Sequence, residues 1–362
     1  MKRQMKLLGL LITLLLADKG FCQDPVFTQY FSTPLYYNPA LTGINSGIRA
    51  RFAFRDQWPA LPNDFKAYYF SADLGDRNLP GAGGFGLMVN SDNEGIAFIR
   101  NLEVALTIGV RIPITRYMSC QVGIKAAVKQ KVVNWDDFVF TDQLSEKYGN
   151  IYTSDFSFPD ANKRVYPDFG AGGVFQFAND NSQVTGTAGF AVDHLFRPDE
   201  SFLSTGSAPL PRKWIIHGDA VISTGEGSSG VGRGGGNDPL KINIGVLFLN
   251  QAKMNFIEVG FNLLKYNIYL GAWFKSTLTG TPSNSLPILA GYRFTFAEDM
   301  SIKFIYSYDI PVSGAMLGTG GAHEVSLVLE FDKLQILGSS SSHRSGYKSR
   351  SGNSTSECPA FY

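Results

Sequence analysis

The stretch LEVALTIGVR, residues 102–111, carries apolar side chains at every second position, and Glu103 and Arg111 are among the residues between them. An alternation with a period of two predicts a β-strand that has one apolar face and one polar face. The same pattern recurs at residues 121–129, 256–263 and 324–332. We therefore expect an all-β protein built from many such strands.

The predicted strands number fourteen: 48–56, 64–74, 82–91, 97–112, 117–132, 167–178, 183–193, 213–223, 240–250, 254–264, 266–275, 287–297, 300–309 and 323–333. Most reach ten residues, the length of a tilted membrane-spanning strand (about 9–11) rather than of a soluble strand (about 5–6). We expect a transmembrane outer-membrane β-barrel of about 14 antiparallel strands, to within two. Its apolar face would contact outer-membrane lipid, and its polar face would line the lumen.

Charged residues on the polar faces should then point into the lumen. They are Glu103, Arg111, Lys125, Lys129, Glu258, Arg293, Lys303, Glu324 and Glu330. The lengths of the connections favour a periplasmic N-terminus, because bacterial barrels have long outer loops and short inner turns. Connections 133–166, 194–212 and 310–322 fall on the expected outer side. Two connections depart from the pattern: the Gly-rich connection 224–239 is long on the inner side, and the connection between strands 240–250 and 254–264 is short on the outer side.

The two ends of the chain lie outside this strand pattern. Residues 1–22 read as a signal peptide, with Lys2, Arg3 and Lys6 before an apolar run too short to span a bilayer. An acylated Cys22 is the competing interpretation, but the bulky Phe21 before it disfavours a lipoprotein signal. Residues 334–362 are predicted to be a flexible periplasmic tail, because a stretch so poor in apolar residues cannot bury enough surface to order itself.

Residues 23–47 precede the barrel, which is predicted to span residues 48–333. This segment holds Pro25, Pro34 and Pro39, which exclude a regular strand, and it is rich in Phe and Tyr. A fourteen-strand barrel is wider than the roughly eight strands whose side chains fill an interior. The segment is therefore expected to be either a plug in the lumen or a collar in the periplasm.

Several functional classes are disfavoured by the composition and the motifs. A net charge of +1 does not suggest binding to nucleic acid. His194, His217, His323 and His343 do not have metal-binding spacing, and no G-x-S-x-G nucleophile motif is present. We expect neither an enzyme nor a cofactor-binding protein. After signal removal two cysteines remain, Cys120 and Cys358, and the sequence does not decide whether they pair.

Four spaced motifs carry a family resemblance. The first is Asp24-Pro25-Val26-Phe27-Thr28-Gln29-Tyr30, followed by Pro34-Leu35 and Asn38-Pro39-Ala40. The others are Arg55-Asp56-Gln57-Trp58-Pro59, Asp193-His194-Leu195-Phe196-Arg197-Pro198 with Ser201-Phe202, and the ending Cys358-Pro359 before aromatic residues. In this order they resemble the PorP/SprF family of type IX secretion system membrane proteins of Bacteroidetes.

The resemblance implies an outer-membrane component of the type IX secretion and gliding-motility apparatus. Its expected partners are a secreted cargo, such as the C-terminal domain of an adhesin, and the periplasmic ring components of the machine. The family motifs and the aromatic end of the tail mark the residues expected to contact partners: Gln29, Tyr30, Asn38, Pro39, Trp58, His194, Pro198, Phe361 and Tyr362. The resemblance does not separate an export role from an anchoring role.

Three alternatives remain open at this point. A solute-conducting outer-membrane porin would share the strand count and the charged lumen. An outer-membrane lipase or protease would need a nucleophile beside a histidine, and no convincing pair is present. A soluble secreted β protein would bury its apolar strand faces instead of turning them to lipid.

Overall fold

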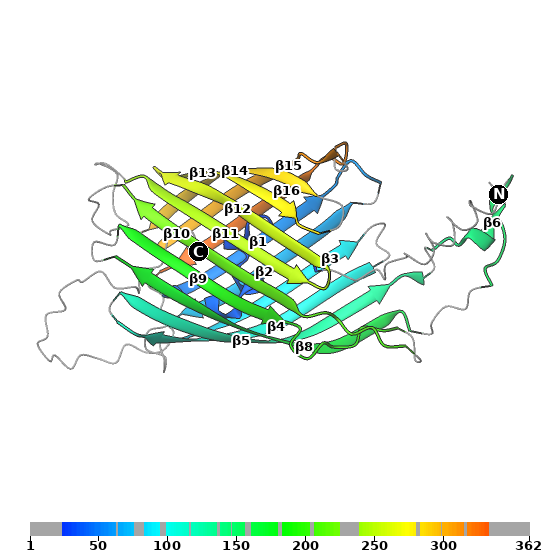
Figure 1. Cartoon of the computed structure of the whole chain (residues 1–362), viewed down its shortest axis with the longest axis horizontal. Coiled ribbons are helices and arrows are strands. Elements are labelled where there is room, and N and C mark those ends of the chain that lie inside the picture. The colour runs from blue at the N-terminus through cyan, green and yellow to red at the C-terminus, as the bar shows by residue number, and fades with distance from the viewer. Residues whose placement is uncertain are drawn as a thin grey trace, which may run out of the picture.

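The computed structural model describes residues 24–62, 64–75, 83–94, 99–115, 117–135, 138–145, 147–155, 161–179, 183–202, 206–224, 239–279, 283–297, 299–314 and 317–332. Within these residues the chain forms a closed antiparallel barrel of fourteen strands (Figure 1). The predicted signal peptide, most of the Gly-rich connection, the tail and Cys358 lie outside the described residues.

The barrel strands follow one another in chain order. They are β1 (Gly47–Gln57), β2 (Phe65–Gly75), β3 (Gly84–Glu94), β4 (Ile99–Pro113), β5 (Met118–Val133), β8 (Lys163–Ala178), β9 (Val184–Asp193), β10 (Lys213–Ser223), β11 (Lys241–Gln251), β12 (Met254–Lys265), β13 (Ile268–Thr277), β14 (Asn284–Ala297), β15 (Met300–Pro311) and β16 (Ala322–Phe331). All fourteen predicted strands are confirmed, and the largest error in a boundary is the start of β8. That start was missed because residues 163–166 do not alternate cleanly in sequence.

Pairing of the first strand with the last closes the barrel. β1 runs antiparallel to β16, with Ile48 opposite Phe331 and Gln57 opposite Ala322. Hydrocarbon offers no hydrogen-bond partner to a free strand edge, so a membrane sheet must close on itself. Among the described residues, no helix is long and apolar enough to cross a membrane.

The two faces of the strands separate as the alternation predicts. Leu106, for example, is 63% exposed on the outer surface, whereas its neighbour Thr107 is buried against the lumen. The predicted lumen-facing residues Glu103, Lys125 and Glu258 are likewise buried in the interior. The outer surface is therefore an apolar belt suited to lipid, and the polar side chains lie inside.

The connections give the barrel two unlike ends, which we call the loop end and the turn end. The loop end carries the long connections 134–162, 194–212 and 312–321. The turn end carries mostly short connections, although connection 224–240 is long. One of the shortest is the pair Tyr266 and Asn267, both with positive φ. Two successive positive φ values are the geometry of a type I′ turn between antiparallel strands. Because bacterial barrels place their long loops outside the cell, the loop end is expected to be extracellular.

Connection 134–162 contains structure of its own. A turn of 3-10 helix, η4 (Thr141–Gln143), leads into a small hairpin formed by β6 (Leu144–Ser145) and β7 (Gly149–Asn150). Figure 1 shows this hairpin well beyond the rim of the barrel. The sequence pattern did not reveal it, because strands of two residues leave no periodic signal.

Residues 24–46, here called the luminal segment, lie inside the barrel (Figure 1). The segment contains three short helices, η1 (Tyr30–Ser32), α2 (Pro34–Tyr37) and η2 (Pro39–Leu41). Contacts place η1 against β1 and β16, and η2 against β4, β5 and β8. Every residue from 27 to 45 is buried, and the segment supplies five of the eight buried aromatic side chains in the main apolar cluster. The hydrophobic core of this protein is thus inside the barrel, around its own N-terminal segment.

Glycines in the wall allow the luminal segment to lie close to the strands. A Cβ atom at Gly123 would stand 2.4 Å from the backbone of Pro39 and Ala40, and one at Gly172 would stand 2.1 Å from the Asn38 side chain. Such approaches exclude any larger residue unless the backbone moves. Gly123 and Gly172 therefore form a seat for η2.

The glycine seat generates a first prediction. Gly123→Val should push Pro39 away from β5 and raise hydrogen–deuterium exchange across residues 30–46, with a loss of roughly 1–3 kcal/mol in the free energy of unfolding. Mass spectrometry of the purified barrel measures the exchange. Gly173→Ala is the matched control, because its Cβ would meet nothing closer than 4.0 Å. Equal exchange in the two variants would show that the seat does not hold the segment.

Candidate functional site

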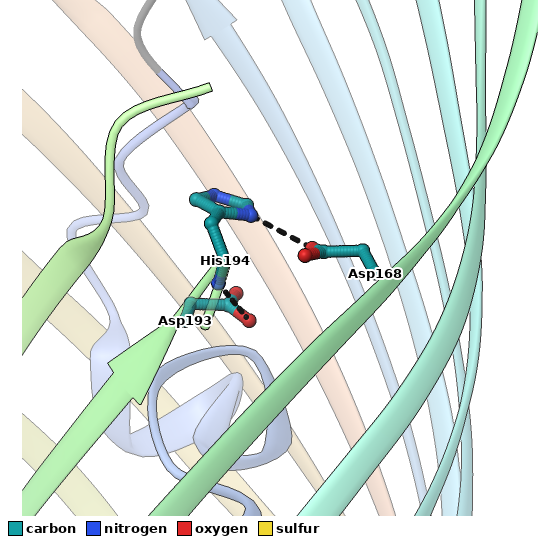
Figure 2. Close-up of side chains that lie close together, drawn as sticks. All are labelled: Asp168, Asp193 and His194. Carbon is teal, nitrogen blue, oxygen red and sulfur yellow. Dashed lines mark hydrogen bonds and ion pairs between the residues drawn. The ribbon is translucent and has the colours of Figure 1, made fainter. Parts of the chain in front are cut away.

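The luminal segment is attached to the loop end of the barrel by Asp24. Its Oδ2 atom lies 2.8 Å from Nε2 of His194, the first residue after β9. The other ring nitrogen of His194, Nδ1, lies 2.7 Å from Asp168 on β8 (Figure 2). A ring that faces a carboxylate on both nitrogens must donate from both, which only the charged imidazolium form can do.

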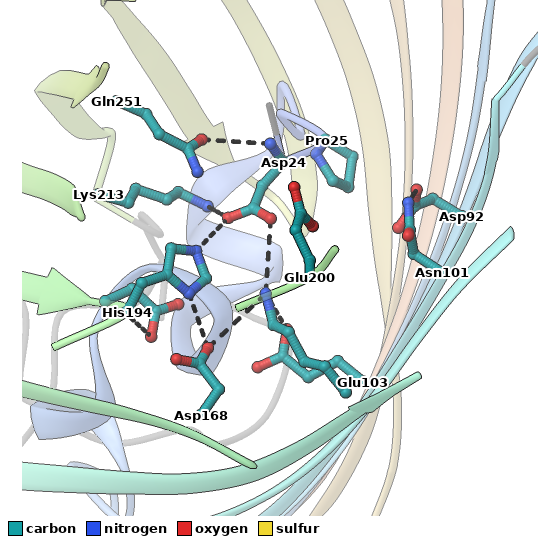
Figure 3. Close-up of polar contacts among 12 residues, drawn as sticks. Asp24, Pro25, Asp92, Asn101, Glu103, Asp168, His194, Glu200, Lys213 and Gln251 are labelled. Carbon is teal, nitrogen blue, oxygen red and sulfur yellow. Dashed lines mark hydrogen bonds and ion pairs between the residues drawn. The ribbon is translucent and has the colours of Figure 1, made fainter. Parts of the chain in front are cut away.

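Lysines on the wall complete this cluster, which we call the latch network. It consists of Asp24, Glu103, Lys125, Lys129, Asp168, Asp193, His194 and Lys213. Figure 3 labels Asp24, Glu103, Asp168, His194 and Lys213 among them. Lys125 lies between Glu103 and Asp193, at 2.8 and 2.5 Å, whereas Lys129 and Lys213 contact Asp24 at 3.5 and 3.4 Å. The four carboxylates balance three lysines plus the imidazolium, so the buried charge sums to zero. Neutrality matters because an unpaired charge in such a place is costly.

The pKa of His194 agrees with this geometry. Burial and the nearby Lys129 oppose protonation, but the carboxylates of Asp24, Asp193 and Asp168 outweigh them and raise the pKa of His194 to about 9. The pKa of Asp24 is held well below its usual value, because Lys129, Lys213 and His194 outweigh its burial. Both groups are therefore charged at neutral pH.

Asp168, Asp193 and His194 also lie close enough together to suggest a metal site, with candidate ligand atoms within 4.8 Å of one another. Their atoms are already engaged, however. Lys125 contacts Asp193, and the His194 nitrogens are taken by Asp24 and Asp168. A metal ion would have to displace these cations and hydrogen bonds, so the trio is better explained as part of the latch network.

A second charge cluster holds the luminal segment on the opposite wall. Arg55 of β1 contacts Asp309 at 2.8 Å and Glu324 at 3.0 Å, and Lys275 contacts Asp309 at 3.1 Å. The Thr28 hydroxyl lies among them, and the backbone N–H groups of residues 28 and 29 donate to Glu324 at 2.7 and 2.8 Å. This anchor uses backbone groups as well as side chains.

The remaining contacts tie the segment down toward the turn end. Asn38 donates to the carbonyl of Gly173, and its amide also lies 3.0 Å from the His217 ring. Gly43 donates its N–H to Asp73, which is also paired with Arg51. The segment is thus attached along its whole length, by ion pairs near the loop end and by close packing near the turn end.

A cavity of about 1040 Å³ lies at the loop end, and we call it the vestibule. Asp24, Pro25 and Val26 form part of its lining, so the luminal segment contributes its first residues to the wall of the cavity. Trp58, Phe65 and Phe256 supply aromatic surface, and charged residues of both signs supply the rest. A cavity of this size and mixed chemistry can hold a segment of a polypeptide.

The predicted partner-contact residues fall in three places. Gln29, Tyr30, Asn38 and Pro39 are buried in the lumen, His194 belongs to the latch network, and Trp58 lines the vestibule. Pro198 is half-buried in connection 194–212, and Phe361 and Tyr362 lie outside the described residues. The buried residues of this set therefore make contacts within the chain, and their contact with a partner protein stays a prediction.

Sequence reasoning did not single out Asp24, Asp168, Asp193 or Lys213 as site residues. The sequence does place two of them, Asp168 and Lys213, as charged residues in predicted strands. The alternation cannot show that Asp24 meets these wall charges, because Asp24 lies outside the strand pattern, 105 residues before Lys129 and 189 before Lys213.

A closed barrel with an apolar outer belt and a filled, charge-paired lumen belongs to the class of outer-membrane β-barrel proteins. The family model described as "Type IX secretion system membrane protein PorP/SprF" matches residues 20–329. The chain therefore belongs to the PorP/SprF family, as its motifs indicate. The family is described as a membrane component of a secretion system, not as an enzyme family.

Comparison with other proteins adds little to this assignment. No curated protein sequence matches the chain. Similar solved structures include a Pseudomonas aeruginosa FadL homologue, at 13% identity and TM-score 0.44, which covers 87% of this chain and 100% of that one. The TodX deltaS2S3 mutant monoaromatic hydrocarbon channel is 10% identical, with TM-score 0.45, and covers 82% of this chain and 94% of that one. These likenesses are too distant to support an argument about function.

The charged form of His194 generates a second prediction. Its pKa is raised from 6.5 to about 9, so its stabilising contribution is complete below pH 6.5 and is lost as the pH rises through 9. A shift of this size corresponds to an energy on the order of 3 kcal/mol. Denaturant titration in detergent at pH 7 and pH 10 should show a larger loss of stability for the natural protein than for His194→Gln. Equal losses would mean that His194 is not the titrating group.

Proposed function

We propose that this barrel is a docking protein of the type IX secretion and gliding apparatus. It binds a secreted surface protein at its loop end, helps to export or anchor it, and contacts the periplasmic machinery at its turn end. The observation that carries the proposal is the occupied lumen: the chain's own residues 24–46 fill the barrel and are attached to its wall throughout. A barrel arranged in this way is suited to holding partners at its two ends rather than to passing solutes.

The loop end supplies a surface for docking. Connection 134–162 and connection 194–212 expose large apolar side chains beyond the strands, among them Tyr148 at 67% and Phe196 at 77% exposure. Exposed apolar groups of this kind are typical of protein-binding surfaces, especially where aromatic residues gather. Beside them the vestibule offers room for a chain end or an extended segment of the bound protein.

The filled lumen also distinguishes this function from that of a porin. A porin requires a continuous water path, whereas here the luminal segment runs from the vestibule to the start of β1 at the turn end. The natural protein in a planar bilayer should therefore show little conductance. Deleting residues 24–44 should open the lumen and raise the conductance at least severalfold. High conductance of the natural protein would favour the porin function instead.

The docking role is tested by capture of a partner. A tagged barrel purified from detergent-solubilised outer membranes should bring down a secreted surface protein, identified by mass spectrometry. Replacing residues 138–155 by a short Gly-Ser linker removes the hairpin but leaves β5 and β8 intact, so capture should fall while the barrel stays folded. Shortening connection 224–240 at the turn end is the matched control and should leave capture of the secreted protein unchanged. Undiminished capture without residues 138–155 would contradict the proposed surface.

A further inference from the structure

The latch network joins the luminal segment to the base of a long loop. His194 is the first residue of connection 194–212, and it is held in the left-handed region with a φ of 55°. Arg197, three residues later, has a φ of 50°. Residues other than glycine rarely adopt this conformation, and it persists only where the surroundings enforce it. The loop base is therefore a strained point held in place by its contacts.

Connection 194–212 is in turn tied to connection 134–162, and together we call them the loop pair. The Phe202 ring packs edge-on against Trp135 with 5.8 Å between centroids. Glu200 forms an ion pair with Lys131, at the end of β5, at 3.1 Å. A force on the loop pair therefore reaches His194 along the backbone of residues 194–200, which joins His194 to the paired Glu200.

On the other side of the latch, Asp24 has the most exposed side chain of the network. Its side chain is 16% exposed, and its contacts with Lys129 and Lys213 are long, leaving His194 as its one short ionic partner. Asp24 also lines the vestibule, so water can solvate its carboxylate if His194 withdraws. Release at this point is far less costly than breaking a fully buried pair, where the charge would stay unsolvated.

The geometry points to a releasable latch formed by Asp24 and His194 that couples the loop pair to the luminal segment. A partner that shifts connection 194–212 draws His194 away from Asp24, and the outer part of the luminal segment loosens. The segment continues into β1 at the turn end, so a change at the outer mouth has a direct physical route to the opposite end of the barrel. The use of the latch by a partner rests on the proposed docking function, but the coupling itself is a property of this chain alone.

Coupling between two sites is reciprocal, so loosening either the luminal segment or connection 194–212 should also loosen the other. Asp24→Asn, His194→Gln and the double variant are purified as folded barrels, and hydrogen–deuterium exchange is followed in residues 27–46 and 195–212. Each single variant should speed exchange about 5-fold or more in both segments, the lower end of typical coupling. The double variant should exchange no faster than the single ones, because both substitutions break the same contact.

Asp64→Asn is the matched control, since it removes the charge of a half-buried carboxylate paired with Lys66 at the same end of the barrel. This control should leave the exchange rates of residues 27–46 and 195–212 unchanged. Acceleration confined to the segment that carries the substitution, or additive effects in the double variant, would overturn the latch.

A second variant keeps the inference testable if the latch variants fail to fold. Phe202→Ala touches neither Asp24 nor His194, yet it loosens the loop pair and should speed exchange in residues 27–46. No change there would overturn the coupling. The experiments separate the latch from the docking function. If the barrel captures a secreted protein but the exchange rates of the two segments are not coupled, only the latch is wrong. If the exchange rates are coupled but no secreted protein is captured, only the docking function is wrong.

Discussion

The antiparallel pairing of β1 with β16 is the interaction on which the rest of the structure depends. It satisfies the last free strand edge, which a lipid environment would otherwise leave without hydrogen-bond partners. Closure with fourteen strands also creates an interior wider than wall side chains alone can fill. The luminal segment fills this interior, and the glycine seat and the buried charge clusters hold the segment in place.

Charge pairing then determines how the interior is filled. The strands turn their polar faces inward because their apolar faces meet lipid, so the lumen necessarily contains many ionisable side chains. Once residues 24–46 displace water from it, these charges need partners within the chain, and the latch network around His194 and the cluster around Arg55 supply them. Any shift of the segment would leave a buried charge unpaired, which is costly, so these pairs favour a single position of the segment.

The two halves of the luminal segment are held by different forces. Toward the turn end, the backbone of Pro39 lies so close to Gly123, and the Asn38 side chain so close to Gly172, that a Cβ atom at either glycine would collide with them. Near the loop end, Asp24 is held by ion pairs beside a cavity that water can enter. Close packing is insensitive to moderate changes in charge or hydration, whereas ion pairs respond to both. The chain thus has a close-packed attachment toward the turn end and an ion-paired attachment at the loop end.

The sequence by itself determined the barrel and the family. Alternation such as that of residues 102–111 marks every spanning strand, because lipid and lumen impose opposite demands on successive side chains, and the spaced motifs around Gln29, Trp58 and His194 mark the family. The tertiary structure alone decided that residues 24–46 lie in the lumen and that Asp24, Asp168 and His194 meet there. Asp24 lies 170 residues before His194 in the chain, and local periodicity carries no information about which charges the closed barrel brings together.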